Sequence, residues 1–218
     1  MTRHILLAGS TGLIGRRVRL ELGERADIDL ISLVRNGSTV PGHPIEFEHL
    51  YVAPEATLKP VAPDGADVAI SCLGTTIRTA GSQAAMFRVD HDYVLALAKG
   101  AKALGARHFI LVSSVGAGGP GFYLKTKGAI EQAVTQLGFE RIDIIRPGFL
   151  LGQRDDTRLM EAAAQRLLGA LSPILPDRLA RYGTISAQKV SAAIAQLAGK
   201  TEPGHHVYEN VDLRRLSE

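Results

Sequence analysis

Residues 4–15 read His-Ile-Leu-Leu-Ala-Gly-Ser-Thr-Gly-Leu-Ile-Gly, an apolar run followed by three glycines spaced three residues apart. The apolar run predicts a buried strand, and residues 13–22 predict a helix, because they contain no proline. In such a unit Gly9 permits the sharp turn, Gly12 lets the backbone approach a pyrophosphate, and Gly15 lets the helix pack against the strand. The free N–H groups at the helix start then face the anion. The stretch predicts a dinucleotide-binding turn; the alternative is a tight strand–helix turn without a ligand.

The alternation of short apolar runs and helix-forming segments continues along the chain. We expect further strands at residues 28–34, 45–50, 67–73, 107–113, 141–146 and 206–209, the last as an edge strand. We expect helices at residues 84–104, 123–137, 157–170 and 187–198. Repeated strand–helix units predict an α/β fold with a doubly wound parallel sheet. The length suits one such sheet, so we expect a single domain over residues 1–218.

The composition excludes several classes of protein. Hydrophobic residues make up 45% of the chain and charged residues 22%, which is enough apolar surface for a sizeable core. The net charge is only +3, and basic residues are not interleaved with aromatic ones, so we expect no nucleic-acid partner. No apolar run has the length of a membrane span, and no cluster of His, Cys, Asp and Glu has metal-ligand spacing. We therefore expect neither a membrane nor a metal site.

The single cysteine, Cys72, bears on the cellular compartment. One cysteine excludes an internal disulfide and indicates a reducing environment. Its apolar neighbours favour the role of a small buried hydrophobic residue. The sequence also lacks the apolar segment and cleavage site of a secretory signal. These observations lead us to expect a cytoplasmic protein.

Polar and glycine-rich segments follow several of the expected strands. They are the glycine turn after the first strand, then Leu73-Gly74-Thr75, Ser113-Ser114 and Pro147-Gly148. In a doubly wound sheet the ligand crevice lies at the carboxyl ends of the strands. We therefore expect all four segments to meet at one edge of the sheet.

Tyr123 and Lys127 form the second element of the expected site. They stand four residues apart on a predicted helix, so both lie on one face, and Ser114 precedes them at the end of a strand. A lysine ammonium favours the phenolate form of a neighbouring tyrosine. A serine hydroxyl can hold a carbonyl or alcohol oxygen against that tyrosine. The three side chains together predict a proton-transfer site, whereas the Tyr-x-x-x-Lys pair alone is typical of an ordinary half-exposed helix face.

Arg35 indicates which nicotinamide cofactor the site would take. The second expected strand ends Leu33-Val34-Arg35-Asn36, where an acidic residue would bind the ribose 2′-hydroxyl of NAD. A guanidinium suits a 2′-phosphate instead, because its planar fork matches phosphate oxygens and stays charged. Arg16 could assist from the helix start. We therefore expect NADP(H) rather than NAD(H); the alternative is that Arg35 is a solvated loop residue.

Longer strings of sequence resemble a known family. The glycine turn, Ser113-Ser114, Tyr-x-x-x-Lys and Arg146-Pro147-Gly148 resemble an atypical short-chain dehydrogenase/reductase. Five strings resemble the HIV Tat-interacting protein oxidoreductase-like group: Cys-Leu-Gly-Thr-Thr (72–76), Arg-Val-Asp-His-Asp-Tyr-Val (88–94), His-Phe-Ile-Leu-Val-Ser-Ser (108–114), Tyr-Leu-Lys-Thr-Lys-Gly (123–128) and Arg-Pro-Gly-Phe-Leu-Leu-Gly (146–152). The resemblance covers most of residues 3–155. It implies a Rossmann fold that binds NADPH. Separately, we expect residues 151–186 to form a small extension on the substrate side.

The resemblance also implies roles for individual residues. Tyr123 would be the acid/base, Lys127 its electrostatic partner and ribose contact, and Ser114 the hydroxyl that positions oxygen, a role Ser113 could take instead. Asp90 stands where related reductases carry an asparagine that completes a proton relay, and the loop from Ser114 to Tyr123 is short. The expected cofactor contacts are Gly9, Ser10, Thr11, Gly12, Leu13, Ile14, Gly15, Arg16, Arg35, Leu73, Gly74, Thr75, Ser113, Tyr123, Lys127, Pro147 and Gly148.

Three functions are compatible with these residues. The first is an NADPH-dependent oxidoreductase that acts on a small carbonyl or alcohol substrate. The second is an NADPH-binding regulatory or scaffold protein with little or no catalysis. The third is a sugar-nucleotide epimerase or dehydratase, which uses the same serine, tyrosine and lysine. For that function the segment after Leu151 is short, because it would have to form a separate sugar-binding domain. The helices at 84–104 and 123–137 could pair across a two-fold axis, so we also expect a homodimer by analogy of fold.

Overall fold

Seven parallel strands form the central sheet of the computed structural model, which describes residues 2–151 and 181–218. The strand order is β3-β2-β1-β4-β5-β6-β9, and each neighbouring pair runs in parallel. The chain builds outward from β1 to β2 and β3, then returns to the other side of β1 with β4 and continues to β9. The predicted doubly wound parallel sheet is thus confirmed, and its topological switch point lies between β1 and β4.

The elements have the following bounds. The strands are β1 (Arg3–Ala8), β2 (Ile28–Arg35), β3 (His43–Ile45), β4 (Val68–Ser71), β5 (His108–Val112), β6 (Arg141–Ile145), β7 (Phe149–Leu151), β8 (Thr184–Ser186) and β9 (Gly204–Tyr208). The helices are α1 (Leu13–Gly23), α2 (Phe47–Val52), α3 (Pro54–Leu58), α4 (Ile77–Ala80), α5 (Gln83–Phe87), the π-helical turn η1 (Arg88–Asp92), α6 (Tyr93–Ala103), α7 (Phe122–Thr135), α10 (Ala187–Leu197) and α11 (Asn210–Leu216). Strands β7 and β8 form a separate two-stranded parallel sheet.

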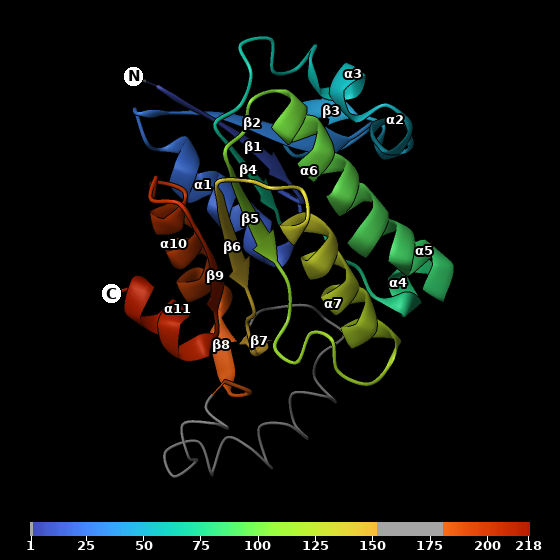
Figure 1. Ribbon diagram of the computed structural model, residues 1–218, viewed down its shortest axis with the longest axis vertical. Coiled ribbons are helices and arrows are strands. Elements are labelled where there is room, and N and C mark those ends of the chain that lie inside the picture. The colour runs from blue at the N-terminus through green and yellow to red at the C-terminus, as the bar shows by residue number, and fades with distance from the viewer. Residues whose placement is uncertain (1, 152–180) are drawn as a thin grey trace.

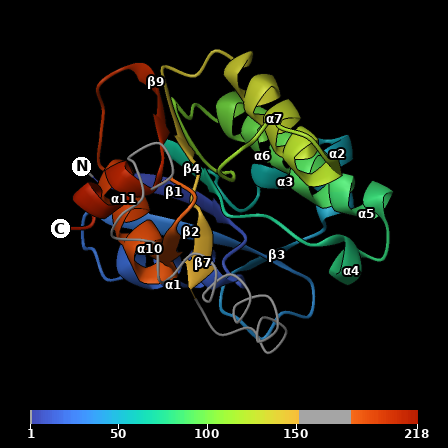
Figure 2. The same cartoon turned by 90° about the horizontal axis from the view of Figure 1, so that it is seen from below.

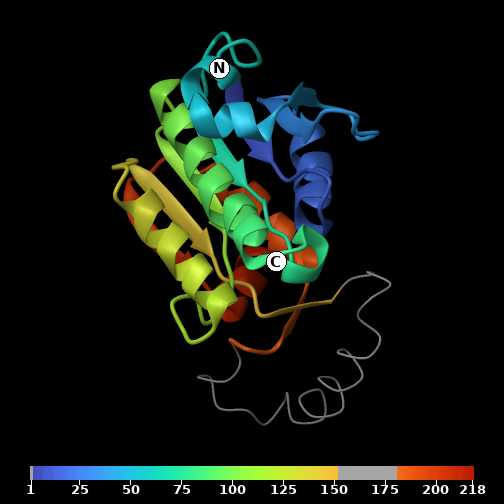
Figure 3. The same cartoon turned by 90° about the vertical axis from the view of Figure 1, so that its right-hand side faces the viewer.

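Helices cover both faces of the sheet, as Figures 1 and 2 show. Helices α1, α10 and α11 lie on one face, and α2, α3, α6 and α7 lie on the other. Side chains alternate between the two cores along each strand, so that Ile5 and Leu7 of β1 face α1 while Leu6 faces the opposite layer. Because both faces are buried, the strands are continuous apolar runs, which is the property that made them recognisable in the sequence. Helices α6 and α7 run side by side (Figure 3).

Two expected elements differ from the structure. The strand expected at residues 45–50 is wrong: β3 ends at Ile45, and residues 47–52 form α2. Ile45 and Phe47 suggest the two-residue period of a strand, but Phe47 and Leu50 are three apart and bury one helical face. The helix expected at 84–104 is interrupted by the π-helical turn η1 between α5 and α6. The helix expected at 157–170 lies outside the described residues, as does most of the 151–186 segment.

A buried polar network joins β5, β6 and β9 on the face of the sheet that α10 covers. The Asp143 carboxylate is bonded to His108 Nε2 and to Arg141 Nε, both at 2.9 Å. Arg141 also donates to the Tyr208 hydroxyl at 3.2 Å. The ring of His108 is almost fully buried, and desolvation lowers the pKa of His108 below its ordinary value of 6.5, although the bond to Asp143 acts in the opposite direction.

This network predicts that the fold loses stability in mild acid. Above pH 6.5 the His108 imidazole is neutral in both the folded and the unfolded state, so no stability is lost to its protonation there. As the pH falls from 6.5 toward the lowered pKa of His108 in the folded state, the proton binds to the unfolded chain first. This lowers the free energy of unfolding by at most about 1.4 kcal/mol per pH unit. We expect the Tm of His108→Gln to fall less between pH 7 and 5 than the Tm of the parent protein. The exposed His205 on β9 offers the control: His205→Gln should follow the parent curve, and equal slopes in all three proteins would contradict the assignment.

Candidate functional site

The glycine turn between β1 and α1 is built by close backbone contact. Gly9 has φ +85°, and a Cβ there would lie 2.4 Å from the carbonyl carbon of Cys72. A Cβ on Gly15 would lie 2.2 Å from the carbonyl oxygen of Gly9. These two glycines are therefore required by the packing of β1, α1 and the end of β4. Gly12, by contrast, has only the Gly9 carbonyl oxygen near its Cβ position, at 3.3 Å, among the described residues, so its outer side is open.

The start of α1 has the chemistry of an anion site. Gly12 is its N-cap and supplies no side-chain cap, and the first turn contains no acidic residue. The N-terminus of an eleven-residue helix carries partial positive charge and N–H groups that point outward. In addition, Ser10 Oγ is fully buried and has no hydrogen-bond partner among the described residues. An unpartnered buried hydroxyl in this turn fits a site that a polar ligand completes.

The end of β4 lies directly against the glycine turn. The Cys72 N–H donates to the Ala8 carbonyl at 2.9 Å, and the next residues, Leu73 and Gly74, continue along the same edge of the sheet. Cys72 is partly buried beside Gly15, and burial raises the pKa of its thiol to about 12. The cysteine therefore packs against the glycine turn, as its sequence context indicated.

Arg35 and Arg16 are both exposed near this turn. Arg35 is the last residue of β2, two positions beyond Leu33, which pairs in register with Ala8 of β1. Arg16 lies in the first turn of α1, and its N–H donates to the Gly12 carbonyl at 3.0 Å. Both residues thus lie at the edge of the sheet that carries the glycine turn.

Tyr123 and Lys127 lie on the first two turns of α7. Tyr123 is 40% exposed, whereas Lys127 is only 4% exposed. The Lys127 Nζ lies 5.9 Å from the centroid of the Tyr123 ring. The expected pair is therefore brought together, with the lysine as the buried partner and the tyrosine open to solvent.

Lys127 is held by a carboxylate that the sequence only hinted at. Its Nζ lies 2.9 Å from Asp90 Oδ1, and the other carboxylate oxygen accepts the Thr75 N–H at 2.8 Å. A Cβ built on Gly74 would lie 3.6 Å from Asp90 Oδ1 and 3.8 Å from Lys127 Nζ. The loop after β4, the turn η1 and helix α7 therefore meet at one point, and this convergence of separated segments is the centre of the candidate site.

The two serines at the end of β5 have different environments. Ser113 is buried, and its hydroxyl donates to Glu131 Oε1 at 2.5 Å. Glu131 is also bound by Arg146 through Nε at 3.0 Å, and this contact raises the pKa of Arg146. Ser114 is only half-buried, and among the described residues its hydroxyl makes one hydrogen bond, to the Val115 carbonyl, which is long at 3.3 Å. Ser113 is thus committed to a structural network, whereas Ser114 keeps its hydroxyl accessible, without a hydrogen bond to Tyr123 among the described residues.

Gly148 is fixed by the C-terminal part of the chain, whereas the Pro147 carbonyl accepts the Val115 N–H at 3.0 Å. The Gly148 N–H donates to Asn210 Oδ1 at 2.8 Å, and Asn210 Nδ2 donates to the Gly183 carbonyl at 2.7 Å. A Cβ on Gly148 would lie 2.3 Å from that same carbonyl oxygen. The Gly148 N–H is therefore already bonded to Asn210, a residue that no local sequence signal identified. Glu131, by contrast, could have been found, since it continues the four-residue spacing of Tyr123 and Lys127.

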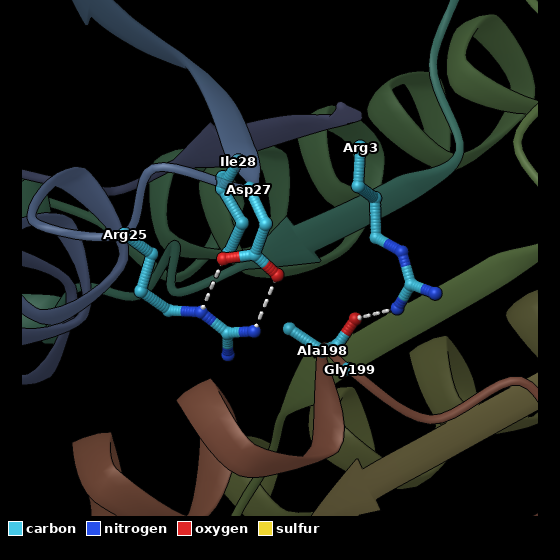
Figure 4. Close-up of a pocket in the computed structure, with 6 residues that line it drawn as sticks. All are labelled: Arg3, Arg25, Asp27, Ile28, Ala198 and Gly199. Atoms are coloured by element: carbon cyan, nitrogen blue, oxygen red, sulfur yellow. Dashed lines mark hydrogen bonds and ion pairs between the residues drawn. The ribbon is translucent and has the colours of Figure 1, made fainter. Parts of the chain in front are cut away.

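Figure 4 shows a pocket at the amino ends of the strands, on the opposite side of the sheet from the glycine turn. It lies where β1 and β2 begin, against the end of α10. Arg25 makes two hydrogen bonds to Asp27, and Arg3 donates to the Ala198 carbonyl at 2.6 Å. The Arg3 contact ties the end of α10 to the amino end of β1. The pocket is therefore separate from the candidate site, which lies at the carboxyl ends.

A comparison with protein families identifies the chain. Residues 9–200 match the family described as NAD(P)H-binding, and the match begins at the first glycine of the turn described above. The chain belongs to this NAD(P)H-binding family. The family assignment agrees with the motifs in the sequence and with the Rossmann-like arrangement of the seven-stranded sheet.

Named relatives of this NAD(P)H-binding chain are of two kinds. It is 35% identical to protein FMP52 of Coccidioides immitis over 90% of this chain and 87% of that protein. It is 46% identical to protein HTATIP2 of Rattus norvegicus, but over only 49% of this chain and 45% of that protein. The match to fmp52 of Emericella nidulans, at 40% identity, likewise spans 60% of that relative. The family resemblance drawn from the sequence motifs is confirmed by these matches.

Solved structures share the fold of this NAD(P)H-binding chain at low identity. A thiolation-reductase di-domain from an archaeal non-ribosomal peptide synthetase has a TM-score of 0.72 at 16% identity, over 96% of this chain and 70% of that one. UDP-glucose 4-epimerase of Thermotoga maritima has a TM-score of 0.68 at 15% identity, over 94% and 76%. RMD of Pseudomonas aeruginosa, solved with NADPH, has a TM-score of 0.65 at 17% identity, over 96% and 76%. At these identities the likeness shows the fold alone.

The comparisons also correct one expectation from the sequence. A cytoplasmic location is contradicted, because several fungal relatives of this NAD(P)H-binding chain are mitochondrial proteins by name. The single cysteine argues only against an oxidising compartment, so it could not separate the remaining compartments. Within residues 2–151 and 181–218, no helix has the length and apolar character needed to span a bilayer.

Proposed function

We propose that this chain is an NADPH-dependent oxidoreductase that acts on a small carbonyl or alcohol substrate. When bound, the nicotinamide would supply the hydride chemistry, and the protein would supply orientation and the proton. The glycine turn and the start of α1 would hold the pyrophosphate, with Ser10 as an additional hydroxyl in the turn. The arginines at the ends of β2 and in α1 would face the ribose phosphate.

Tyr123, Lys127 and Ser114 would handle the proton in this proposal. Tyr123 would exchange a proton with the substrate oxygen, because its phenol is the exposed member of the set. Lys127 would act as a fixed donor beneath it, held in place by its buried surroundings. Ser114 would position the substrate oxygen, since its hydroxyl is half-exposed and weakly bonded. Ser113 does not fit this role, because its hydroxyl is bonded to Glu131.

The observation that carries the proposal is the meeting of Lys127, Gly74 and Thr75 around one carboxylate. Lys127 comes from α7 and the other two from the loop after β4, next to the switch point of the sheet. Dinucleotides bind at the switch point in doubly wound sheets, so an acid/base pair placed here would lie beside the reacting end of the cofactor. A tyrosine and a buried lysine elsewhere on α7 would have no such neighbour.

Preference for NADPH over NADH is the first property to test, by calorimetric titration with each coenzyme. We expect tighter binding of NADPH, and we expect Arg35→Ala to weaken it by about tenfold, because an exposed charge-assisted contact to the 2′-phosphate is lost. NADH affinity should be unchanged in this variant. Arg17→Ala is the matched control, since Arg17 is also an exposed arginine of this region. Equal losses for both coenzymes in Arg35→Ala would contradict the assignment, and failure of both coenzymes to bind the parent protein would contradict the proposed function.

A second candidate is an NADPH-binding regulatory protein without turnover. It is favoured by one observation, namely that Lys127 is already paired with Asp90. In that case NADPH would bind with the predicted preference, but no carbonyl compound would be reduced. Single-turnover oxidation of bound NADPH by a panel of aldehydes and ketones separates the two candidates.

A further inference from the structure

Asn210 is a buried side chain that holds two separated segments of the chain. It is 1% exposed and is the first residue of α11. Its Oδ1 accepts the Gly148 N–H at 2.8 Å, and its Nδ2 donates to the Gly183 carbonyl at 2.7 Å. Neither bond caps α11, because Glu209 and Asp212 form the capping box of that helix. The Asn210 amide therefore serves the segment after β6 rather than the helix from which it comes.

Pro147 and Gly148, at the end of β6, lie beside the proposed site. The Pro147 carbonyl accepts the N–H of Val115, the residue that follows Ser114. In the sheet, β4, β5 and β6 follow β1 on the side away from β2. A dinucleotide with its ribose phosphate at the end of β2 and its pyrophosphate at the glycine turn would therefore have its nicotinamide toward the ends of β5 and β6.

The polar backbone groups at the end of β6 are almost all in use. Pro147 has no N–H, and its carbonyl already accepts a hydrogen bond. The Gly148 N–H is bonded to Asn210, and the Phe149 N–H donates to the Gly183 carbonyl at 3.2 Å. The Gly148 carbonyl is the exception, since it accepts no hydrogen bond from the described residues. Gly148 is only partly buried, so this carbonyl is available as an acceptor for a ligand.

Asn210 sets the direction of the Gly148 carbonyl through two peptide planes. In a planar trans peptide a carbonyl points opposite to the N–H of the next residue. The Gly148 carbonyl thus points away from the Gly183 oxygen, to which the Phe149 N–H is bonded. Asn210 Nδ2 holds that same oxygen, and Asn210 Oδ1 holds the peptide plane that precedes Gly148. Both planes that flank Gly148 are therefore fixed by one side chain.

Close packing leaves Gly148 no room to move toward the returning chain. A Cβ on Gly148 would lie 2.3 Å from the Gly183 carbonyl oxygen, 2.6 Å from Asn210 Nδ2 and 2.9 Å from the Arg181 carbonyl oxygen. Gly148 does not have a positive φ, so its backbone angles alone do not require glycine. Glycine is required here by contact with Asn210 and the segment that Asn210 holds.

We propose that Asn210 is a positioning residue that directs the Gly148 carbonyl toward the carboxamide N–H of a bound nicotinamide. A carboxamide NH₂ carries two donors, and a carbonyl oxygen accepts from such a donor. Asn210 thereby acts on the nicotinamide end of the coenzyme, whereas the glycine turn and Arg35 serve its phosphates. This inference rests on the proposed function for the placement of the nicotinamide, but it requires no turnover of a carbonyl compound.

The test is calorimetric titration with three ligands that differ in one part of the coenzyme. The first is NADP⁺. The second is its 3-acetylpyridine analogue, in which a methyl group replaces the carboxamide NH₂. The third is adenosine 2′,5′-bisphosphate, which lacks the nicotinamide half. We expect the parent protein to bind the acetylpyridine analogue about fivefold more weakly than NADP⁺, because one neutral hydrogen bond is lost.

Asn210→Ala should remove this discrimination. The affinity for NADP⁺ should fall about fivefold, to that of the acetylpyridine analogue, while the affinity for adenosine 2′,5′-bisphosphate stays unchanged. Gly148→Ala should give the same pattern, because its Cβ would push Gly148 away from Asn210 and Gly183. This second variant also serves if Asn210→Ala does not fold.

Asp212→Ala is the matched control on the same helix. Asp212 accepts the Glu209 N–H at 3.0 Å as part of the capping box, and it does not contact Gly148. Loss of this cap should lower the Tm but leave the affinities for all three ligands as in the parent protein. The control therefore separates loosening of α11 from loss of the bond to Gly148.

Three results would overturn the inference. One is a parent protein that binds NADP⁺ and the acetylpyridine analogue equally well. Another is a folded Asn210→Ala protein that keeps the preference of the parent for NADP⁺. The third is an equal loss of affinity for NADP⁺ and adenosine 2′,5′-bisphosphate in Asn210→Ala, which would leave Asn210 a purely structural role. A protein that shows the expected affinities but reduces no carbonyl compound would contradict the proposed function instead and leave the role of Asn210 intact.

Discussion

Tyr123→Phe is expected to slow carbonyl reduction by about 10³-fold while leaving the affinity for NADPH unchanged. The substitution removes one hydroxyl from a side chain that is 40% exposed, so neither the fold nor the glycine turn should respond. Loss of a positioned general acid typically costs 10²- to 10⁴-fold, and a 10³-fold loss is about 4 kcal/mol of transition-state stabilisation. Phenylalanine keeps the ring that lies 5.9 Å from Lys127 Nζ, so packing against the lysine is retained.

The measurement is single-turnover oxidation of bound NADPH by the carbonyl compound to which the parent protein responds best. Tyr182→Phe is the control, because Tyr182 is also an exposed tyrosine and lies beside the Gly116 loop that leads into α7. It should retain the parent rate. A Tyr123→Phe protein with unchanged turnover would remove Tyr123 from the mechanism, whereas a protein that binds NADPH poorly would place the residue in cofactor binding.

Gly15→Ala is expected to abolish measurable NADPH binding and to lower the Tm by roughly 6–12 °C. The new Cβ would lie 2.2 Å from the carbonyl oxygen of Gly9 and 2.7 Å from its carbonyl carbon. These are backbone atoms that cannot rotate away, so α1 must shift from β1 and displace the turn between them. Overpacking of this kind costs about 3 kcal/mol, and each kcal/mol corresponds to about 2–4 °C in a chain of this length.

Gly23→Ala offers a matched control at the other end of the same helix. A Cβ on Gly23 meets nothing within 4 Å, so the substitution should leave NADPH affinity unchanged and raise the Tm slightly through helix propensity. Thermal denaturation followed by circular dichroism, together with calorimetric titration, measures both effects. A Gly15→Ala protein that binds NADPH like the parent would show that the turn tolerates displacement and that its glycines are not needed for the ligand.

The features that sequence alone predicted are those that depend on local spacing. The glycine turn required only residues 4–15, and the Tyr123–Lys127 pair required only the period of one helix. The strands were recognisable because a parallel sheet buried on both faces needs continuous apolar runs. Arg146 was noted only as part of a motif, although its bond to Glu131 joins the end of β6 to α7.

The features that sequence alone did not predict depend on contacts between distant segments. The ion pair of Asp90 with Lys127 joins residues of two different helical segments, and the position of Asp90 depends on a π-helical turn with no recognised sequence signal. The bonds of Asn210 to Gly148 and Gly183 join three parts of the chain. Residues 47–50 were assigned to a strand but belong to α2, because five or six residues can satisfy both a strand and a helix period.

Asn210 has a consequence for how the two parts of this chain stay together. It holds Gly148 and Gly183 with one side chain, and the Phe149 N–H also donates to the Gly183 carbonyl at 3.2 Å. The chain therefore leaves the sheet and returns to it at a single fixed point. Gly148 and Gly183 stay joined whatever the length of chain between them, since the entropic cost of closing a loop grows only with the logarithm of its length. A chain cut between these two glycines would therefore keep its two parts attached through Asn210.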